Sequence, residues 1–429
     1  MQTRARPHPE MAAADFAKAP WLVIWEATQA CDLACVHCRA EARPWRSEQE
    51  LSTAEAKALL GSVREMGRPL FVITGGDPLK RPDMAQIVAQ GAALGLRMAL
   101  TPSGTPLATR EAIQQLTDAG LSRLAVSLDG AGAATHDAFR GVAGSWAQSV
   151  RMLRDAREMG LSTQVNTTVT RHNIGELGDV AALLAELRVS LWSVFFLVPT
   201  GRGRARDVAS PEAFEYVFHR LYELSRTAPF DIKTTAAPQY RRVILQRQVD
   251  ERRAGTRTEA PQPLTAGLGF SLADGVGRAK GVNDGNGCVF VGHTGEIQPS
   301  GFLPVSAGNV RTDDLAEVYR EHPLFTALRD PDRLKGKCGV CEYRDVCGGS
   351  RARAFAMTGD PLEAEPFCVH EPARWTRLVD AGEAEETDDY FAARVPGWRQ
   401  PVRELPDRMV SLREHLCARP APTFQTHTR

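Results

Sequence analysis

Three cysteines within eight residues carry the clearest chemical signal in this chain of 429 residues. Cys31, Cys35 and Cys38 follow a short apolar run, with three and then two residues between them. Thiolates hold iron in iron–sulfur clusters, and a four-iron cluster usually takes four cysteine ligands. Three thiolates would leave one iron open to a substrate or cosubstrate. Zinc and inert thiols are the alternatives, although zinc needs a fourth ligand, for which His37 is the nearby donor.

Bulk composition narrows the class of protein. The cysteine count is nine, an odd number, and residues 1–20 contain no apolar secretory segment, so a disulfide framework is disfavoured. Lys+Arg and Asp+Glu both number 52, which gives a net charge of zero and predicts no nucleic-acid partner. The longest apolar stretch, 191–198, is far too short to span a bilayer, so no membrane partner is expected. We therefore expect a cytoplasmic protein whose thiols stay reduced.

The stretch 31–38, CDLACVHC, resembles the signature of radical S-adenosylmethionine (SAM) enzymes, including an aromatic residue, His37, before the third cysteine. The resemblance implies a [4Fe–4S] cluster on three cysteines, with SAM chelated at the open iron by its amino and carboxylate groups. Reductive cleavage of SAM would give a 5′-deoxyadenosyl radical. By the same resemblance His37 packs near the adenine, and a ferredoxin or flavodoxin is an expected electron donor.

Short β-rich segments alternate with amphipathic helices over the first half of the chain. The expected strands are 21–26, 70–74, 97–101, 123–128, 163–169 and 191–198. Ser52 and Glu55 form a capping-box pattern before an apolar stripe. Helix-ending glycines precede four of the strands, at Gly67, Gly95, Gly120 and Gly160. Such repeats predict parallel strands joined by right-handed crossovers.

No dinucleotide fingerprint follows the first strand, so we predict an α/β fold with a partial (β/α)6 barrel rather than a Rossmann sheet. Barrel enzymes build their sites where the strands end and feed their loops. The cysteine motif lies in the loop after the first expected strand. Motif and predicted topology therefore agree.

The second expected strand ends in Gly75, Gly76, Asp77 and Pro78. Two glycines let a backbone approach a ligand closely, although this tetrapeptide is also an ordinary turn. The segment resembles the "GGEP" element of radical SAM enzymes, which contacts the amino group of SAM, with Asp77 where glutamate is commoner. The resemblance implies further SAM contacts near other strand ends, where a helix cap or turn is the alternative role: Ser103, Ser127, Asp129, Arg140, Asn166 and Val198.

A second set of cysteines lies near the C-terminus, at Cys338, Cys341, Cys347 and Cys368. Spacing alone permits a structural zinc site or a fully ligated iron–sulfur cluster and favours zinc. The arrangement, together with the stretch 347–353, CGGSRAR, resembles the SPASM extension of radical SAM proteins. There these four positions bind an auxiliary [4Fe–4S] cluster. Its expected role is electron transfer, and the alternative is structural stabilisation of the small domain.

Two positions depart from the fuller SPASM pattern. Members with two auxiliary clusters carry cysteines where this chain has Ser300 and Arg351, counted from Gly295 and Cys347. Neither side chain replaces a thiolate well, so we expect no second auxiliary cluster. Two cysteines remain: Cys288, expected to be a small buried hydrophobic residue or, less simply, a ligand, and Cys417, a thiol in the tail.

These observations divide the chain into five parts. Residues 1–19 are expected to be disordered, 20–235 to form the partial barrel, and 236–286 to be an irregular linker or lid. Residues 287–375 would form the SPASM-like unit, which opens with a hairpin of 288–291 and 296–300. A surface helix and a tail would occupy 376–429.

Within the family, the stretches 197–203 and 347–353 look most like the branch that processes tetrapyrrole side chains in the alternative haem and related pathways. The expected substrate is then a small molecule, oxidised after abstraction of a hydrogen atom from an unactivated C–H bond. Clustered arginines could bind its carboxylates or simply form a solvated face: Arg202, Arg204, Arg241 and Arg242.

Two other functions stay open. The chain is also similar to SPASM proteins that modify ribosomally made peptides, but the roughly 20 residues before the first strand are too few for the usual precursor-binding domain. A redox scaffold without SAM chemistry is disfavoured by residues 75–78 and by Asp129. No residue stands out as a general base.

Overall fold

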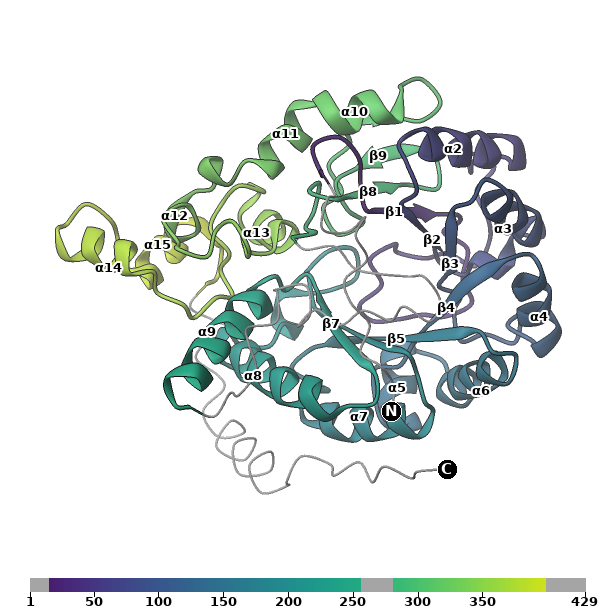
Figure 1. Cartoon of the computed structure of the whole chain (residues 1–429), viewed down its shortest axis with the longest axis horizontal. Coiled ribbons are helices and arrows are strands. Elements are labelled where there is room, and N and C mark those ends of the chain that lie inside the picture. The colour runs from purple at the N-terminus through teal and green to yellow at the C-terminus, as the bar shows by residue number, and fades with distance from the viewer. Residues whose placement is uncertain (1–14, 256–280, 399–429) are drawn as a thin grey trace.

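The computed structural model describes residues 15–255 and 281–398 (Figure 1). One mixed sheet runs through this part of the chain, in the order β10-β9-β8-β1-β2-β3-β4-β5-β6-β7. Its strands are β1 (Leu22–Glu26), β2 (Leu70–Thr74), β3 (Arg97–Leu100), β4 (Leu121–Ser127), β5 (Ser162–Val169), β6 (Leu191–Phe196), β7 (Asp231–Thr235), β8 (Cys288–Val291), β9 (Glu296–Gln298) and β10 (Gly308–Asn309).

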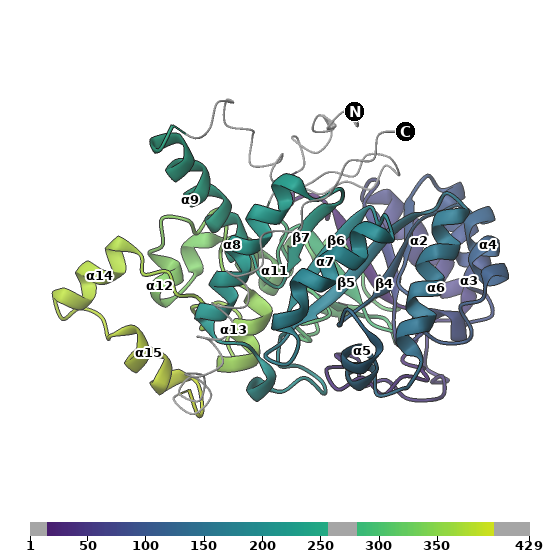
Figure 2. The ribbon, with the colours of Figure 1, turned by 90° about the horizontal axis from the view of Figure 1, so that it is seen from below.

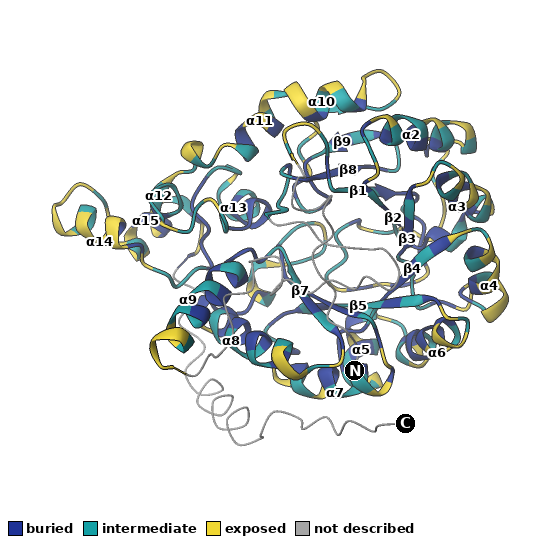
Figure 3. Cartoon of the chain, viewed as in Figure 1, coloured by how far each residue is buried: buried dark blue, intermediate teal, exposed yellow. Residues whose placement is uncertain are grey.

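Strands β1 to β7 are parallel, each paired with the next, and curve into an open barrel (Figure 1). Helices cover the outside of this curved sheet and expose their outer faces (Figure 3). They are α2 (Thr53–Glu65), α3 (Met84–Ala93), α4 (Arg110–Asp118), α6 (Ser145–Glu158), α7 (Leu177–Glu186) and α8 (Pro211–Thr227). Helix α5 (Ala133–Arg140) lies at one end of the barrel (Figure 2), and α9 (Gln239–Arg253) packs on α8. The predicted partial barrel is confirmed.

Local sequence signals set the ends of these helices. The Ser52 hydroxyl accepts from the Glu55 amide at 3.2 Å, and the Glu55 carboxylate accepts from the Ser52 amide at 2.7 Å, so the predicted capping box starts α2. The apolar stripe of α2 is buried against the sheet. The four glycines expected to end helices all have positive φ values.

The barrel is larger than the sequence suggested. Strand β7 was not predicted, because its sequence DIKTT is short and polar and carries little strand signal. The predicted linker over 236–286 is also wrong in its first part, since α9 occupies Gln239–Arg253. Tyr240, Val243 and Ile244 form a buried i, i+3, i+4 stripe within that highly charged helix. Residues 256–280 of the predicted linker lie outside the described part.

The predicted hairpin of the C-terminal unit is confirmed, with Val291 opposite Ile297. It does not stand apart from the barrel, however. Strand β8 runs parallel to β1, with Cys288 opposite Leu22, and so continues the barrel sheet. Cys288 is buried in that sheet, and burial raises the pKa of its thiol.

Short helices complete the C-terminal unit: α10 (Leu315–Glu321), α11 (Pro323–Arg329), α12 (Gly336–Gly339), α13 (Arg351–Thr358), α14 (Ala373–Asp380) and α15 (Thr387–Arg394). Figure 2 shows α14 and α15 projecting from one side of the molecule. Two helices thus stand where one surface helix was expected. Edge-to-face aromatic contacts join α14 to α15 and join Trp398, just after α15, to Phe367 of the unit. Trp398 lies 5.9 Å from Phe367, and Trp375 lies 5.3 Å from Tyr390, between ring centroids.

The chain ends differ from the prediction in one respect. Residues 15–19, expected to be disordered, lie against α10, where the Tyr319 hydroxyl donates to the Phe16 carbonyl at 2.7 Å. Residues 1–14 and the predicted tail over 399–429, including Cys417, lie outside the described residues. Among the helices that the structure describes, none is long and apolar enough to cross a membrane.

Candidate active site

The first cysteine set occupies the loop that follows β1, beside α5, at the end of the barrel where the parallel strands terminate. Backbone bonds hold this loop against α5, since the amides of Ala34 and Val36 donate to carbonyls of that helix at 3.0 and 2.9 Å. The set thus lies where barrel enzymes build their sites.

The three sulfur atoms are surrounded by hydrogen-bond donors. Backbone amides donate to Cys31 Sγ at 3.4 Å and to Cys38 Sγ at 3.5 Å, and the Arg140 guanidinium lies 3.7 Å from Cys35 Sγ. Burial raises the pKa of the Cys31 thiol. Sulfur atoms bound to iron accept such hydrogen bonds, which tune the cluster. The donor set therefore fits an iron–sulfur cluster with three cysteine ligands.

Gly75 and Gly76 give the cysteine loop room to approach the end of β2. The amides of Gly76 and Asp77 donate to the carbonyls of Thr28 and Ala30 at 2.7 and 2.6 Å. A Cβ atom at either glycine would lie 2.4 Å from one of these carbonyl oxygens. The two glycines were predicted to let the backbone approach a ligand. In the structure, the segment that approaches them closely is the cysteine loop itself.

The Asp77 side chain is fully buried and faces protein donors. It accepts from the Leu79 amide at 3.1 Å, the Ser103 amide at 3.4 Å and the Thr105 hydroxyl at 2.7 Å. Burial raises the pKa of Asp77. Asp77 also caps the short 3₁₀ turn that begins at Pro78. Its side chain therefore braces the loops around the site.

Ser103 joins this brace to the first cysteine. Its hydroxyl donates to the Gly76 carbonyl at 2.8 Å and lies 3.3 Å from Cys31 Sγ. The loop after β3 thus reaches the loops after β1 and β2. Thr105, which completes the brace, was missed because an isolated threonine carries no sequence signal.

A charged group built on Asp129 lies beside the cysteine loop. Asp129 is fully buried, pairs with Arg140, and accepts from the Thr168 amide at 2.8 Å. Burial, the largest single cause, would raise the pKa of Asp129, but the Arg140 charge and the smaller effects of its other polar neighbours together outweigh it, so the pKa lies below its usual value. Asp129 is therefore an anion at neutral pH.

Two histidines flank this pair. His37 Nε2 lies 3.8 Å from the Asp129 carboxylate, and His136 Nδ1 accepts from the Asp129 amide at 3.1 Å. Burial, the largest cause for each ring, lowers the pKa of both histidines to about 4. Both rings are therefore neutral at pH 7, which agrees with a packing role for His37 rather than acid–base chemistry.

The remaining predicted SAM contacts lie at neighbouring strand ends. Ser127 ends β4 and is paired in register with Asn166 of β5, whose side-chain oxygen accepts from Gln164 at 2.7 Å. Val198 follows β6 and is buried in a small apolar cluster that includes Leu303 of the C-terminal unit. The structure brings these residues to the same end of the barrel as the cysteine loop.

The loop after β6 contacts the cysteine loop directly. The Arg202 amide donates to the Cys38 carbonyl at 3.0 Å. Gly201 has φ +57°, and a Cβ atom there would lie 2.5 Å from the same carbonyl oxygen. Arg202 Nε and Nη2 are buried and have no hydrogen-bond partner among the described residues. Arg140 Nε and His37 Nδ1 are also buried, and they too have no hydrogen-bond partner in the part of the chain that the structure describes.

A buried donor without a hydrogen-bond partner lowers the stability of the folded protein, unless a bound ligand accepts its hydrogen bond. Four such atoms lie on residues around the cysteine loop. Arg202 therefore has the chemistry to bind a carboxylate there, whereas Arg204, the neighbouring candidate, is exposed.

The second cysteine set comes together as predicted. Its members, Cys338, Cys341, Cys347 and Cys368, line one cavity between α9, α12 and the segments around them. Backbone amides donate to Cys338, Cys341 and Cys347 at 3.4 Å each. Burial raises the pKa of Cys341 to about 12 and of Cys368 to about 11. Four converging thiols with amide donors fit a metal centre better than inert cysteines.

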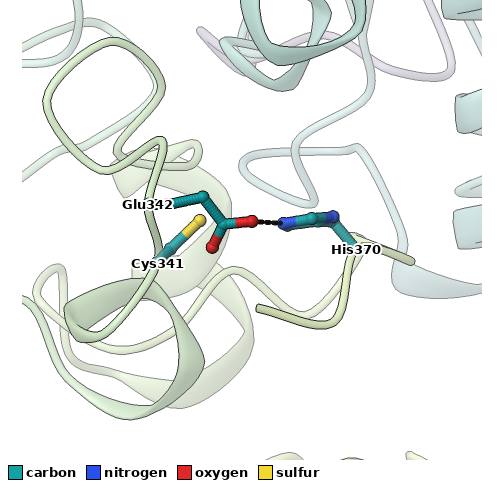
Figure 4. Close-up of side chains that lie close together, drawn as sticks. All are labelled: Cys341, Glu342 and His370. Carbon is teal, nitrogen blue, oxygen red and sulfur yellow. Dashed lines mark hydrogen bonds and ion pairs between the residues drawn. The ribbon is translucent and has the colours of Figure 1, made fainter. Parts of the chain in front are cut away.

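A histidine missed by sequence reasoning lies beside this cavity. His370 Nε2 lies 2.9 Å from Glu342 Oε1, close to Cys341 (Figure 4). The three donor atoms of these residues lie within 4.8 Å of one another. Because Cys341 belongs to the second cysteine set, His370 and Glu342 flank that set.

Two arginines expected near a substrate lie elsewhere. Arg242 pairs with Glu215 at 2.5 Å and lines the second cysteine cavity, and Arg241 donates to the Val346 carbonyl at 3.1 Å. Both belong to α9, whose first turns pack against the C-terminal unit. Their proposed role as partners of substrate carboxylates is therefore wrong, because Arg242 is paired with Glu215 of α8 and Arg241 donates to backbone carbonyls.

The two positions that depart from the fuller SPASM pattern are both buried. Ser300 hydrogen-bonds Asp284. Arg351 donates to the Glu363 carbonyl at 2.7 Å and places Nη2 3.9 Å from Cys338 Sγ.

Comparisons with known proteins agree with this architecture. The family model of the "Radical SAM superfamily" matches residues 25–184. The chain is 40% identical to an AdoMet-dependent heme synthase of Methanosarcina barkeri over 83% of this chain and 98% of that protein. It is 40% identical to one of Nitratidesulfovibrio vulgaris over 83% of this chain and 94% of that protein.

Solved structures are more distant in sequence and show the fold. Streptococcus suis SuiB bound to its precursor peptide SuiA superposes with a TM-score of 0.61 at 16% identity, over 82% of this chain and 76% of that one. The fold is thus a radical SAM partial barrel with a SPASM-like C-terminal extension. The chain belongs to the radical SAM superfamily and is a radical SAM enzyme related to AdoMet-dependent heme synthases.

Proposed function

We propose that this enzyme oxidises a carboxylate-bearing side chain of a tetrapyrrole in haem biosynthesis, as an AdoMet-dependent heme synthase. One observation carries the substrate class: the 40% identity extends over 98% of the length of the Methanosarcina barkeri relative of that name.

Cys31, Cys35 and Cys38 would hold the [4Fe–4S] cluster, and residues 75–78 would contact SAM through backbone carbonyls. With both bound, reductive cleavage of SAM supplies a 5′-deoxyadenosyl radical for abstraction of a hydrogen atom. A ferredoxin or flavodoxin would deliver the electron. The chain's own residues shape this site: Asp77 braces the loops, and Asp129 holds Arg140 beside Cys35.

Arg202 would anchor the substrate. Its Nε and Nη2, which have no partner in the described part of the chain, lie in a loop fixed to the Cys38 carbonyl, so a bound carboxylate would lie beside the first cysteine set. A guanidinium binds a carboxylate through two parallel hydrogen bonds, which fixes the orientation as well as the position of the side chain. The neutral His37 ring would add packing surface rather than charge.

The second cysteine set would hold an auxiliary [4Fe–4S] cluster with four protein ligands. After hydrogen abstraction, the substrate radical must lose one electron to become a closed-shell product. A neighbouring carboxylate then leaves as carbon dioxide, or a neighbouring carbon releases a proton, and a carbon–carbon double bond forms. The auxiliary site is the proposed acceptor of that electron.

The experiment is anaerobic reconstitution followed by reaction with SAM, dithionite and an iron coproporphyrin. We expect 5′-deoxyadenosine and a tetrapyrrole of altered mass in the same samples, measured by liquid chromatography and mass spectrometry. Formation of 5′-deoxyadenosine with an unchanged tetrapyrrole that also fails to bind would refute the substrate. Absence of 5′-deoxyadenosine would refute radical chemistry.

A further inference from the structure

The cavity of the second cysteine set is rich in cationic side chains. Arg242, Lys337 and Arg344 line it directly. Arg351 places Nη2 3.9 Å from Cys338 Sγ, and Arg241 donates to the carbonyl of Val346, the residue before Cys347. Five positive charges thus lie around four thiols.

Three of these cations have carboxylate partners. Arg242 pairs with Glu215 at 2.5 Å, Lys337 with Glu371 at 3.0 Å, and Arg344 with Asp332 at 2.7 Å. The acidic residue that lines the cavity, Glu365, is itself paired with Arg353 at 2.9 Å. These pairs largely cancel, so they add little net charge to the cavity.

Arg241 and Arg351 differ from them. Arg241 donates to the carbonyls of Val346 and Val282, and Arg351 to carbonyls of the segment 349–363. Within the described residues, neither guanidinium has a carboxylate oxygen within ion-pair distance. Arg351 is 1% exposed. Burial lowers the pKa of Arg241, and the one charge that opposes this shift is the Cys347 thiolate.

A buried cation without an anion is costly, because neutral carbonyls do not replace the lost hydration of a full charge. Arg351 nevertheless places Nη2 3.9 Å from Cys338 Sγ, and Arg241 is held at the carbonyl of the residue before Cys347. A group held by four thiolates would supply the missing negative charge. The two arginines are therefore suited to balance the negative charge of the group that the four cysteines bind.

We propose that Arg241 and Arg351 raise the reduction potential of the iron–sulfur cluster held by the second cysteine set. This inference rests on the auxiliary cluster of the proposed function. Reduction adds one electron and thus one negative charge to the cluster, and two nearby cations without an ion-paired carboxylate among the described residues stabilise that added charge. In turnover the electron comes from the substrate radical, and no bond of the protein forms or breaks.

Arg351 stands where SPASM proteins with two auxiliary clusters carry a further cysteine ligand. In this chain the same position supplies a positive charge and a donor to Cys338 in place of a second metal ligand. Arg241 offers the same charge from α9, outside the SPASM-like unit. The two arginines thus act on the cavity from different elements.

The test is a redox titration followed by electron paramagnetic resonance. The full-length protein would carry the replacements Cys31→Ala, Cys35→Ala and Cys38→Ala, so that the auxiliary cluster alone gives the signal. In this background Arg241→Gln removes the charge, Arg241→Lys retains it, and Arg344→Gln serves as the control. Arg344 lines the same cavity but is paired with Asp332 and partly exposed.

We expect Arg241→Gln to lower the ratio of reduced to oxidised cluster at a fixed solution potential about tenfold, which corresponds to ~59 mV for one electron. Arg241→Lys should recover most of the loss, and Arg344→Gln should change the ratio little. If Arg241→Gln fails to fold, Arg351→Gln tests the same prediction.

The outcomes separate the two claims. A cluster whose ratio is unchanged in both Arg241→Gln and Arg351→Gln overturns the inference and leaves the proposed function standing. Equal losses in Arg241→Gln and Arg241→Lys also overturn it, because charge would not be the cause. If the variant with the three alanine replacements contains no iron and sulfide, the second cysteine set holds no auxiliary cluster. That result would refute the auxiliary cluster of the proposed function and this inference together.

Discussion

Arg353 Nε donates to Glu365 Oε1 at 2.9 Å, and neither side chain is exposed to solvent. The pair connects the two halves of the molecule. The Glu365 amide donates to Cys338 Sγ at 3.4 Å, while Arg353 Nη1 lies 3.5 Å from the carbonyls of Phe196 and Leu197 at the end of β6. A buried ion pair thus joins the second cysteine set to the strand that feeds the Arg202 loop.

Replacing Arg353 with methionine should lower the free energy of unfolding by about 3–5 kcal/mol, because Glu365 would remain buried without its cation. Urea unfolding of the metal-free protein measures this loss. The double variant Arg353→Met, Glu365→Met should lose less than the single one. Arg110→Met, which breaks an exposed pair with Asp155, is the control and should change little. A single variant as stable as wild type would refute this role.

The two cysteine sets should be separable by substitution. Cys38→Ala should abolish cleavage of SAM and lower the iron content by about four atoms per chain, because one cluster loses a ligand. Cys368→Ala should lose a similar amount of iron but keep cleavage of SAM to 5′-deoxyadenosine. Iron analysis and product analysis on the same preparations check both. Loss of zinc rather than iron from Cys368→Ala would contradict the auxiliary cluster.

Asp77→Ala should destabilise the loops around the first cysteine set by about 1–3 kcal/mol, since the amides of Leu79 and Ser103 would lose their buried acceptor. SAM should bind more weakly as a result, as measured by equilibrium dialysis. Asp77→Asn keeps one oxygen acceptor and should lose less. Equal SAM affinity in wild type and Asp77→Ala would show that the brace does not position the site.

Stability should fall in acid partly through His136. Its pKa is about 4 in the folded protein and 6.5 in an unfolded chain, so the unfolded state binds more protons between these values. The loss of unfolding free energy caused by this shift is therefore absent above pH 6.5, grows as the pH falls, and reaches about 3 kcal/mol at pH 4.

His136→Gln removes this titration. The variant should lose less unfolding free energy than the wild type between pH 7 and pH 4.5, measured by urea unfolding of metal-free protein. His37, whose pKa is shifted in the same direction, stays in both proteins and cancels in the comparison. Parallel pH curves for the two proteins would contradict the buried neutral state of His136.

Arg202→Gln should raise the KM for the tetrapyrrole roughly ten- to a hundredfold, because one charge-assisted carboxylate contact would be lost. Cleavage of SAM in the absence of substrate should persist. Arg204→Gln, which removes an exposed charge from the same loop, is the matched control and should leave KM near the wild-type value. A weaker affinity for SAM with an unchanged KM for the tetrapyrrole would assign Arg202 to the SAM carboxylate instead.

Much of this protein could be predicted from local patterns. The spacing of Cys31, Cys35 and Cys38 and the capping box at Ser52 depend on residues close in sequence, and the structure places them as predicted. The same holds for the hairpin of the C-terminal unit. Strand β7 and the helix at the start of the predicted linker were not predicted, because polar or charged sequences give weak signals even when some of their residues are buried.

Short motifs in the sequence carry the chemistry expected of the enzyme, since the residue types that would hold iron and approach SAM lie within them. The tertiary structure alone decided which charges meet those motifs. Arg202 and Arg241 look alike in sequence, yet the former has buried donors without a partner among the described residues, whereas the latter donates to the carbonyl of the residue before Cys347. Electrostatic partners are set by packing between distant segments, and a linear pattern does not encode that distance.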